Sequence, residues 1–194
     1  MSLSKARLCS ALLALSAWAA PALAADVSIV ALPDPAQTGN AVDLQVLISG
    51  VADLYGYNFS LSFDASLLQV SSVTEGAFLA TGGTTFFDGG TIDNSAGTIS
   101  FAFDTLVGAV PGVSGSGTLV TIHMNAIGTG TSALNFVPAD TTFVDSAAIP
   151  NVIAVQTIDR TLTVAAVVPE PSTYLLLAAG LAGIGAWRRR QTSV

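Results

Sequence analysis

The sequence has few of the residues that build reactive sites and cross-links. Its 194 residues include one cysteine, Cys9, and one histidine, His123. A single cysteine cannot form an internal disulfide, and together with one histidine it cannot supply the four ligands of a structural zinc ion. Any catalytic triad would depend on His123, and the chain contains no G-x-S-x-G motif. The sequence therefore favours a non-enzymatic protein without a cofactor.

Positive charge is also scarce. Six Lys and Arg residues face 13 Asp and Glu residues, which gives a formal net charge of −7. Binding to nucleic acid requires Lys and Arg to displace counterions from phosphate, so we exclude nucleic acid as a partner. Five of the six basic residues lie near the two ends of the chain, and Arg160 is the only one between them. The central region is therefore strongly acidic.

The first 24 residues have the pattern of a secretory signal peptide. Lys5 and Arg7 precede an apolar run over residues 8–20, and Ala22 and Ala24 form a small-x-small cleavage site. Cleavage after Ala24 would remove the only cysteine, which suits an exported protein.

The last residues contain a second apolar run, over residues 174–187. This run of 14 residues carries no charge but is shorter than the roughly 20 residues of a typical transmembrane helix. By length alone a buried helix would be favoured. Arg188, Arg189 and Arg190 follow immediately, however, and such a basic cluster is typical of the cytoplasmic end of a membrane helix. We therefore expect a transmembrane helix here.

A short motif precedes this run. Pro169, Glu170 and Pro171, the apolar run and the three arginines follow one another at the end of the chain. Over residues 167–194 this order resembles the PEP-CTERM sorting signal of Gram-negative bacteria. The resemblance implies transient insertion in the inner membrane, cleavage by an exosortase near the Pro-Glu-Pro motif, and delivery to the cell surface or a biofilm matrix. A plain tail anchor with a rigid spacer is the alternative.

Residues 25–166 read as an all-β domain. Apolar and polar residues alternate with a period of two, Gly-rich turns separate the segments, and no stretch of 12 or more residues has a helical period. About nine strands at this spacing predict a β-sandwich. The positions expected to point inward are Val42, Leu44, Val46, Ile48, Tyr55, Tyr57, Phe59, Leu61, Phe63, Ile99, Phe101, Phe103, Val120, Ile122, Met124 and Ala126.

The order of these segments resembles a cohesin domain. The carrying segments are residues 42–70, in which a strand ending in an aromatic residue and Asp leads into a Leu-x-Val strand, residues 117–130, residues 143–146 and residues 161–164. The resemblance implies a jelly-roll sandwich of about nine strands that mediates protein–protein adhesion and is related to carbohydrate-binding modules. The chain has neither a dockerin motif nor a second cohesin copy, so affinity for a dockerin is not carried over.

Strand alternation also predicts a polar surface for a protein partner. The outward positions of two strands are hydrophilic, and we expect them to form one contact face. These positions are Asn58, Ser60, Ser62, Thr121, His123 and Asn125.

Calcium binding is a weaker hypothesis. Asp88 and Asp93 flank a Gly-Gly turn, and calcium takes oxygen ligands from such loops. The chain has no D-x-D-x-D-G run, and aspartates in turns commonly hydrogen-bond their own backbone.

A carbohydrate-binding module for an extracellular polysaccharide is the competing function. Sugar platforms use exposed aromatic rings, but both tryptophans lie in the terminal segments. Tyr55, Tyr57 and Phe87 are the aromatic residues whose removal would abolish glycan binding under this alternative.

Mass spectrometry of the protein from its own host tests the two terminal signals. We expect the mature chain to begin at Ala25 and to end near Pro171, because a signal peptidase and an exosortase remove the flanking segments. A chain that is intact through Val194 would contradict the sorting hypothesis.

Overall fold

A computed structural model describes residues 25–167, 177, 179–181, 184 and 188. The predicted signal peptide and most of the predicted sorting segment, including Pro169, Glu170, Pro171, Arg189 and Arg190, lie outside these residues. The elements are β1 (Ala25–Leu32), β2 (Ala36–Gln37), β3 (Ala41–Ser62), β4 (Leu68–Glu75), α1 (Ala77–Ala80), β5 (Thr85–Asp88), β6 (Thr91–Asp93), β7 (Thr98–Leu106), β8 (Val113–Ala126), β9 (Gly130–Phe136), a 3-10 turn (Pro138–Asp140), β10 (Thr142–Asp145), β11 (Val155–Ile158) and β12 (Arg160–Ala165).

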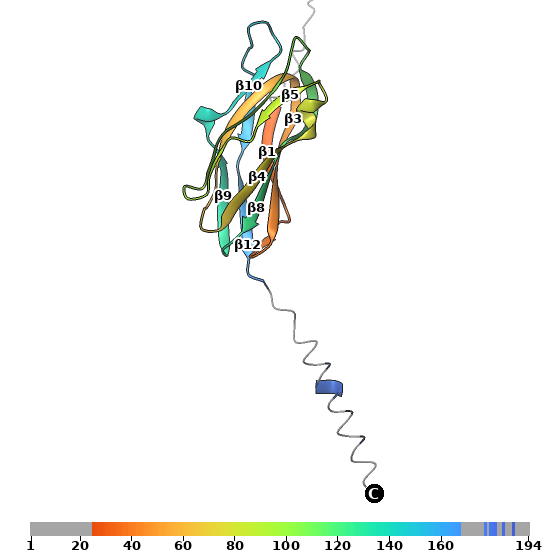
Figure 1. The fold of residues 1–194 in the computed structure, drawn as a ribbon, viewed down its shortest axis with the longest axis vertical. Helices are drawn as coiled ribbons and strands as arrows, with labels where there is room; N and C mark the ends of the chain where they lie inside the picture. The colour runs from red at the N-terminus through yellow and green to blue at the C-terminus, as the bar shows by residue number, and fades with distance from the viewer. Residues whose placement is uncertain (1–24, 168–176, 178, 182–183, 185–187, 189–194) are drawn as a thin grey trace, which may run out of the picture.

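The strands run along the long axis of an elongated domain (Figure 1). β1 starts at the end that carries the loops after β7 and β10, and β12 ends at the opposite end. The expectation of an all-β sandwich is confirmed. The one helix among residues 25–167 with α geometry is the four-residue α1.

β3 belongs to both layers of the sandwich. Its first part pairs with β1 and β8, which in turn pair with β11 and β4, so the order of the first layer is β11–β1–β3–β8–β4. The pairing with β8 shifts register three times between Val46 and Leu54. Gly50 and Asp53 adopt positive φ angles of 68° and 58° within this stretch. These irregularities bend β3 from one layer into the other.

The second part of β3 lies at the centre of the second layer. It pairs with β7 on one side, and with β9 and β10 on the other. β7 also pairs with β5 and β6, while β12 extends the layer from β9.

The inward side chains of both layers form one apolar core. In the second layer, Tyr57, Phe59 and Phe143 are buried, with ring centroids 6.2 Å apart for Tyr57–Phe59 and 6.0 Å apart for Tyr57–Phe143. Phe136 meets Phe59 edge to face at 5.9 Å. Aromatic contacts of this kind add to the free energy gained by burying the rings.

The expected alternation of β7 is wrong after Ile99. Phe59 pairs with Ala102 and Leu61 pairs with Ile99, so two residues of β7, Ser100 and Phe101, oppose the single residue between them on β3. This β-bulge reverses the faces of all later residues of the strand. Phe101 is 57% exposed and Phe103 is half-buried, whereas Ala102, Asp104 and Leu106 are buried. The two phenylalanines predicted for the core therefore lie outside it.

The described residues between 177 and 188 have helical backbone. Leu177, Leu181 and Ile184 are exposed, at 60%, 62% and 61%. Among the described residues, no helix is long and apolar enough to cross a membrane. Most of the predicted transmembrane segment is outside this set, so the helix stays a prediction.

Two phenylalanine-to-alanine variants test the position of the core. Phe59 is fully buried and Phe86 is 60% exposed. We expect Phe59→Ala to lower the free energy of unfolding by about 3–5 kcal/mol, because it leaves a cavity. Phe86→Ala should change it by less than about 0.5 kcal/mol. Urea denaturation measures both, and equal losses would contradict the fold.

Candidate functional site

The predicted polar contact face is divided between the two layers. Thr121, His123 and Asn125 lie on β8 in the first layer. Asn58 and Ser62 lie on the part of β3 that pairs with β7, β9 and β10 in the second layer. The outer surfaces of two packed layers point in opposite directions. The six predicted residues therefore do not form one surface.

Ser60 is buried, so the prediction that it is accessible to a partner is wrong. It is 4% exposed, and its Oγ accepts a hydrogen bond of 2.9 Å from the backbone N–H of Phe101. Because the bulge places Ser100 and Phe101 opposite this one residue, the serine hydroxyl satisfies a backbone donor that the regular strand pairing leaves without a partner.

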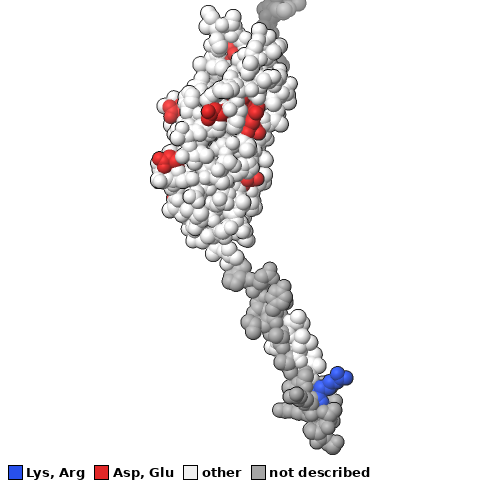
Figure 2. Space-filling model, viewed as in Figure 1, with Lys and Arg blue, Asp and Glu red and all other residues white. Residues whose placement is uncertain are grey.

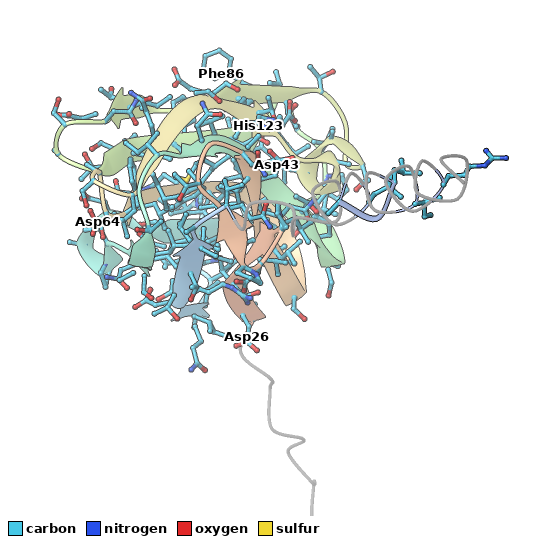
Figure 3. All side chains as sticks on the ribbon, turned by 90° about the horizontal axis from the view of Figure 1, so that it is seen from below. Asp26, Asp43, Asp64, Phe86 and His123 are labelled. Atoms are coloured by element: carbon cyan, nitrogen blue, oxygen red, sulfur yellow. The ribbon has the colours of Figure 1, made fainter. Side chains whose placement is uncertain are left out.

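His123 contacts an acid that is 80 residues away in the sequence. Its Nδ1 lies 2.7 Å from Oδ1 of Asp43 on the neighbouring β3, and its Nε2 lies 3.1 Å from the hydroxyl of Thr74 on β4. A carboxylate only accepts hydrogen bonds, so Nδ1 donates to Asp43. The pair Asp43 and His123 is labelled in Figure 3. Separate strands bring these three residues together, which the local sequence around His123 does not indicate.

Asp43, His123 and Thr74 are hydrogen-bonded in the order acid, histidine and hydroxyl, as in a catalytic triad. They lie, however, on an open face of the sheet. The side chains of His123 and Asp43 are 37% and 48% exposed. The Thr74 hydroxyl also donates to the carbonyl of Thr121 at 3.3 Å. Three hollows on the described surface are lined by other residues. The arrangement therefore provides a hydrogen-bonded polar surface that is open to solvent.

The second layer carries an exposed aromatic patch, formed by Phe86, Phe101 and Phe103. Phe86 is 60% and Phe101 57% exposed. The Phe103 ring lies between them, with its centroid 5.7 Å from that of Phe86 and 6.3 Å from that of Phe101. Phe86 projects from the body of the domain (Figure 3). Exposed aromatic groups of this size are typical of sites where proteins bind other proteins.

Phe101 has a backbone conformation that is rare for its residue type. Its φ angle is +56°. A bulky side chain in this region clashes with its own backbone and adopts it only where the surrounding structure holds it there. Here the bulge and the hydrogen bond to Ser60 hold it. Strain of this kind is often found at functional positions.

A shallow hollow of about 210 Å³ adjoins the aromatic patch. It is lined by residues of three neighbouring strands, which include Asn58 of β3, Phe101 and Phe103 of β7, and Thr142 and Val144 of β10. The Asn58 amide donates to the backbone carbonyl of Asp140 at 2.7 Å. The patch and the hollow adjoin on the second layer and together contain both aromatic and polar side chains. We call this surface the aromatic face.

The two calcium candidates act as turn formers. Asp88 Oδ1 accepts a hydrogen bond from the backbone N–H of Gly90, and Asp93 Oδ1 accepts from those of Ser95 and Ala96. Within the described part of the chain, no group of three or more His, Cys, Asp and Glu side chains is arranged to hold a metal ion. Calcium binding thus gains no support from the positions of these residues.

Hydrogen-bonded aspartates organise the end of the domain away from β12. The Asp53 carboxylate accepts from the Ser146 hydroxyl at 2.8 Å and from the backbone N–H of Gly112 at 2.9 Å. The Ser146 hydrogen bond is the main cause that lowers the pKa of Asp53, and bonds from Asn151 do the same for the pKa of Asp145.

A hollow of about 630 Å³ lies between the loops at this end, and Tyr55, Val110, Pro111 and Pro150 are among the residues that line it. The Tyr55 hydroxyl donates a hydrogen bond of 2.6 Å to the backbone carbonyl of Gly108. The polar groups around this hollow thus mainly bond one another.

The domain surface is acidic. Arg160 is the only Lys or Arg in residues 25–167, and it donates to Asp34 at 2.6 Å. Figure 2 shows carboxylates dispersed over the visible face of the domain, with basic atoms only near the C-terminus.

Comparison with known proteins gives the family. The model of the cohesin domain matches residues 29–164. The chain belongs to the cohesin family. The model of the PEP-CTERM protein-sorting motif matches residues 167–190. Cohesin domains are non-catalytic modules that bind protein partners, and the sorting motif implies export through the membrane to the cell surface. No curated protein matches the chain.

Solved cohesins share the fold at low sequence identity. A non-cellulosomal cohesin from the archaeon Archaeoglobus fulgidus is 16% identical, with a TM-score of 0.54 over 73% of this chain and 91% of that one. The seventh ScaB type I cohesin of Pseudobacteroides cellulosolvens is 17% identical, with a TM-score of 0.58 over 75% and 95%. A type II cohesin from Acetivibrio cellulolyticus, solved as a cohesin–X-dockerin complex, is 16% identical, with a TM-score of 0.61 over 73% and 99%.

Glycine and alanine variants at Phe101 and Phe103 test the bulge. Glycine tolerates a positive φ angle and alanine does not, so we expect Phe101→Gly to be about 0.5–1 kcal/mol more stable than Phe101→Ala. Phe103 has no positive φ angle, and there the order should reverse, because glycine weakens a regular strand. Thermal or urea unfolding measures the differences, and the same order at both positions would refute the bulge.

Proposed function

We propose that the chain is an exported, non-enzymatic cell-surface protein whose cohesin domain binds a protein partner through its aromatic face. The observation that carries this proposal is the cluster of Phe86, Phe101 and Phe103 on the outside of the second layer. Three phenylalanines in contact with water are unfavourable unless a partner covers them. Buried aromatic anchors also supply a large share of the binding energy in protein interfaces.

The charge around the aromatic face indicates the kind of partner. Asp88 ends β5 beside the patch, and at the other side the Asn58 amide donates to the backbone carbonyl of Asp140. Both residues are exposed, and no Lys or Arg lies on β3, β5, β7 or β10, the four strands that form the face. The complementary surface is a protein with an apolar recess for phenylalanine rings and Lys or Arg residues at its rim. Salt should weaken the encounter but leave the apolar contact in place.

The sorting signal gives the route. We propose that residues 1–24 direct export and that residues 167–194 hold the chain in the inner membrane. An exosortase then cleaves near Pro169, Glu170 and Pro171. The match of the sorting-motif model to residues 167–190 supports this order of events. Residues 25–166 would then be the mature domain, at the cell surface or in the extracellular matrix of a Gram-negative bacterium.

A polysaccharide is a less suitable ligand for this domain. Tyr57 is 4% exposed, and its hydroxyl donates to the carbonyl of Leu119, while Phe87 packs against the core. These two residues therefore offer no stacking surface. The exposed rings are tilted, by 50° between Phe86 and Phe103 and by 57° between Phe101 and Phe103. They form no flat platform for a sugar chain, whereas a protein surface can fill the angles between them.

Site-specific photo-crosslinking in the host tests the proposal. A photoreactive phenylalanine analogue placed at Phe86 should yield one discrete protein adduct, because this ring projects from the aromatic face. The same analogue at Thr121, on the outer side of the first layer, is the matched control and should yield none. The Phe101→Gly variant, combined with the analogue at Phe86, should reduce the adduct at least tenfold, since a central aromatic contact contributes more than about 1.4 kcal/mol.

Two results would contradict the proposal. An adduct from Thr121 but not from Phe86 would place the contact on the first layer. A polysaccharide adduct at Phe86 in place of a protein would support the carbohydrate-binding alternative.

A further inference from the structure

The core of the sandwich contains a carboxyl group without a hydrogen-bond donor. Asp104 is 1% exposed, and neither Oδ1 nor Oδ2 has a hydrogen-bond partner of good geometry among the described residues. The backbone N–H of the adjacent Thr105 lowers the pKa of this carboxyl, but less than burial raises it. Burying an ionised carboxylate without partners is strongly unfavourable, and a protein normally avoids it with a donor, a counter-charge or a proton. The buried carboxyl of Asp104 therefore needs a hydrogen-bond donor, a counter-charge or a proton.

The group that faces Asp104 is a second carboxyl, that of Glu75, within hydrogen-bonding range. Glu75 ends β4 in the first layer, whereas Asp104 belongs to β7 in the second, so the contact joins the two layers. The Glu75 carboxylate also accepts a 2.6 Å hydrogen bond from the hydroxyl of Thr85 on β5, next to β7. Glu75 is thus held in place and open to solvent, while Asp104 is enclosed.

Among residues 25–167, no positive charge lies on the strands that pair with β7. From β3, Tyr57 faces it with a buried hydroxyl that donates to the carbonyl of Leu119. β5 and β6 contribute Asp88 and Asp93, which are exposed and bonded within their own turns. The residues of α1, which also packs on β7, have no ionisable side chain. Every charged group on the strands that pair with β7 near this pair is acidic.

We propose that Asp104 and Glu75 share one proton at neutral pH, forming a hydrogen-bonded carboxylic acid–carboxylate pair that ties the two layers of the sandwich together. Two carboxyl groups in contact cannot both be ionised without strong repulsion, and one proton between them turns the repulsion into a hydrogen bond. Loss of this proton in alkaline solution leaves two negative charges facing each other beneath the aromatic face. The domain is then stabilised by mild acid.

The pKa of Asp104 is raised, as a shared proton requires. Burial, and secondly the charge of Glu75, raise the pKa of Asp104 from 3.8 to about 7. Between these two values the folded chain holds a proton that the unfolded chain has lost, so the free energy of unfolding falls as pH rises from about 4 to about 7. Asp53, Asp64 and Asp145 have lowered pKa values, so they lose their stabilisation only below about pH 4. The two effects therefore act in separate pH ranges.

Thermal unfolding of the full chain in mild detergent, at pH 5 and pH 8, tests the pair. We expect the Tm of the wild type to be about 5 °C or more higher at pH 5 than at pH 8. Asp104→Asn places an amide donor against Glu75 and needs no proton, so its Tm should be nearly equal at the two pH values and above the wild type at pH 8. Glu75→Gln offers a donor to the Asp104 carboxylate and should also reduce the difference.

Asp140→Asn is the matched control, because it removes one exposed carboxylate and should leave the pH dependence of the wild type unchanged. Infrared spectroscopy gives a readout that does not depend on stability. At pH 6 the wild type should show the carbonyl absorption of one protonated carboxylic acid, and Asp104→Asn should lack it.

Three results would overturn the proposal. The first is an equal Tm of the wild type at both pH values, and the second is the absence of the carboxylic acid absorption at pH 6. The third is a rise in the wild-type Tm on addition of Ca²⁺ at pH 8 that Asp104→Asn does not show, because a cation would then take the place of the proton. If Asp104→Asn does not fold, Glu75→Gln and the wild-type infrared spectrum decide the question.

Discussion

A single extra residue in β7 determines what the second layer presents on each side. Ser100 and Phe101 together oppose Ser60. The backbone N–H of Phe101, which has no partner in the strand pairing, donates to the Ser60 hydroxyl. From this point every side chain of β7 changes face. The exposed rings of Phe101 and Phe103 and the buried carboxyl of Asp104 are therefore two consequences of one bulge. A regular strand would bury two phenylalanines and expose the acid. That arrangement would have the lower free energy if only the burial of apolar and charged groups is considered.

The two consequences concern different properties of the molecule. The outward rings create an apolar surface that suits a protein partner. The inward carboxyl makes the contact between the layers depend on a proton. Both lie on the strand next to the central β3, whose 22 residues link the layers, so the aromatic face rests on the most extensively paired part of the sandwich.

Much of the fold could be predicted from the sequence, because alternation and turn residues are local signals. Val42 to Ile48 and Val120 to Met124 alternate without interruption, and the structure buries the expected faces. The bulge was missed, because Phe101 and Phe103 are the more apolar set of β7, and a pattern based on hydrophobicity selects them for the core. One signal was present. Ile99 and Leu106 are both apolar but lie seven positions apart, an odd offset that a regular strand cannot place on one side.

The contacts of the polar surface depend on pairing between distant strands, which a single sequence does not reveal. Asp43 reaches His123 only because β3 lies beside β8, and Glu75 meets Asp104 only because β4 and β7 belong to layers that face each other. The predicted contact face failed for the same reason. Asn58 and Asn125 have similar surroundings in the sequence, but β3 changes layer before Asn58, so the two residues lie on different layers.

Cysteine accessibility along β7 tests the central claim, the reversal of faces at the bulge, most directly. In a Cys9→Ser background the chain has no other thiol, so single cysteines at positions 101, 102, 103 and 104 can be compared by their rates of reaction with a maleimide. The bulge predicts fast labelling at 101 and 103, with protection at 102 and 104 until the domain is unfolded. Protection at 101 and 103 with fast labelling at 102 and 104 would show a regular strand, and would contradict both the aromatic face and the buried acid pair.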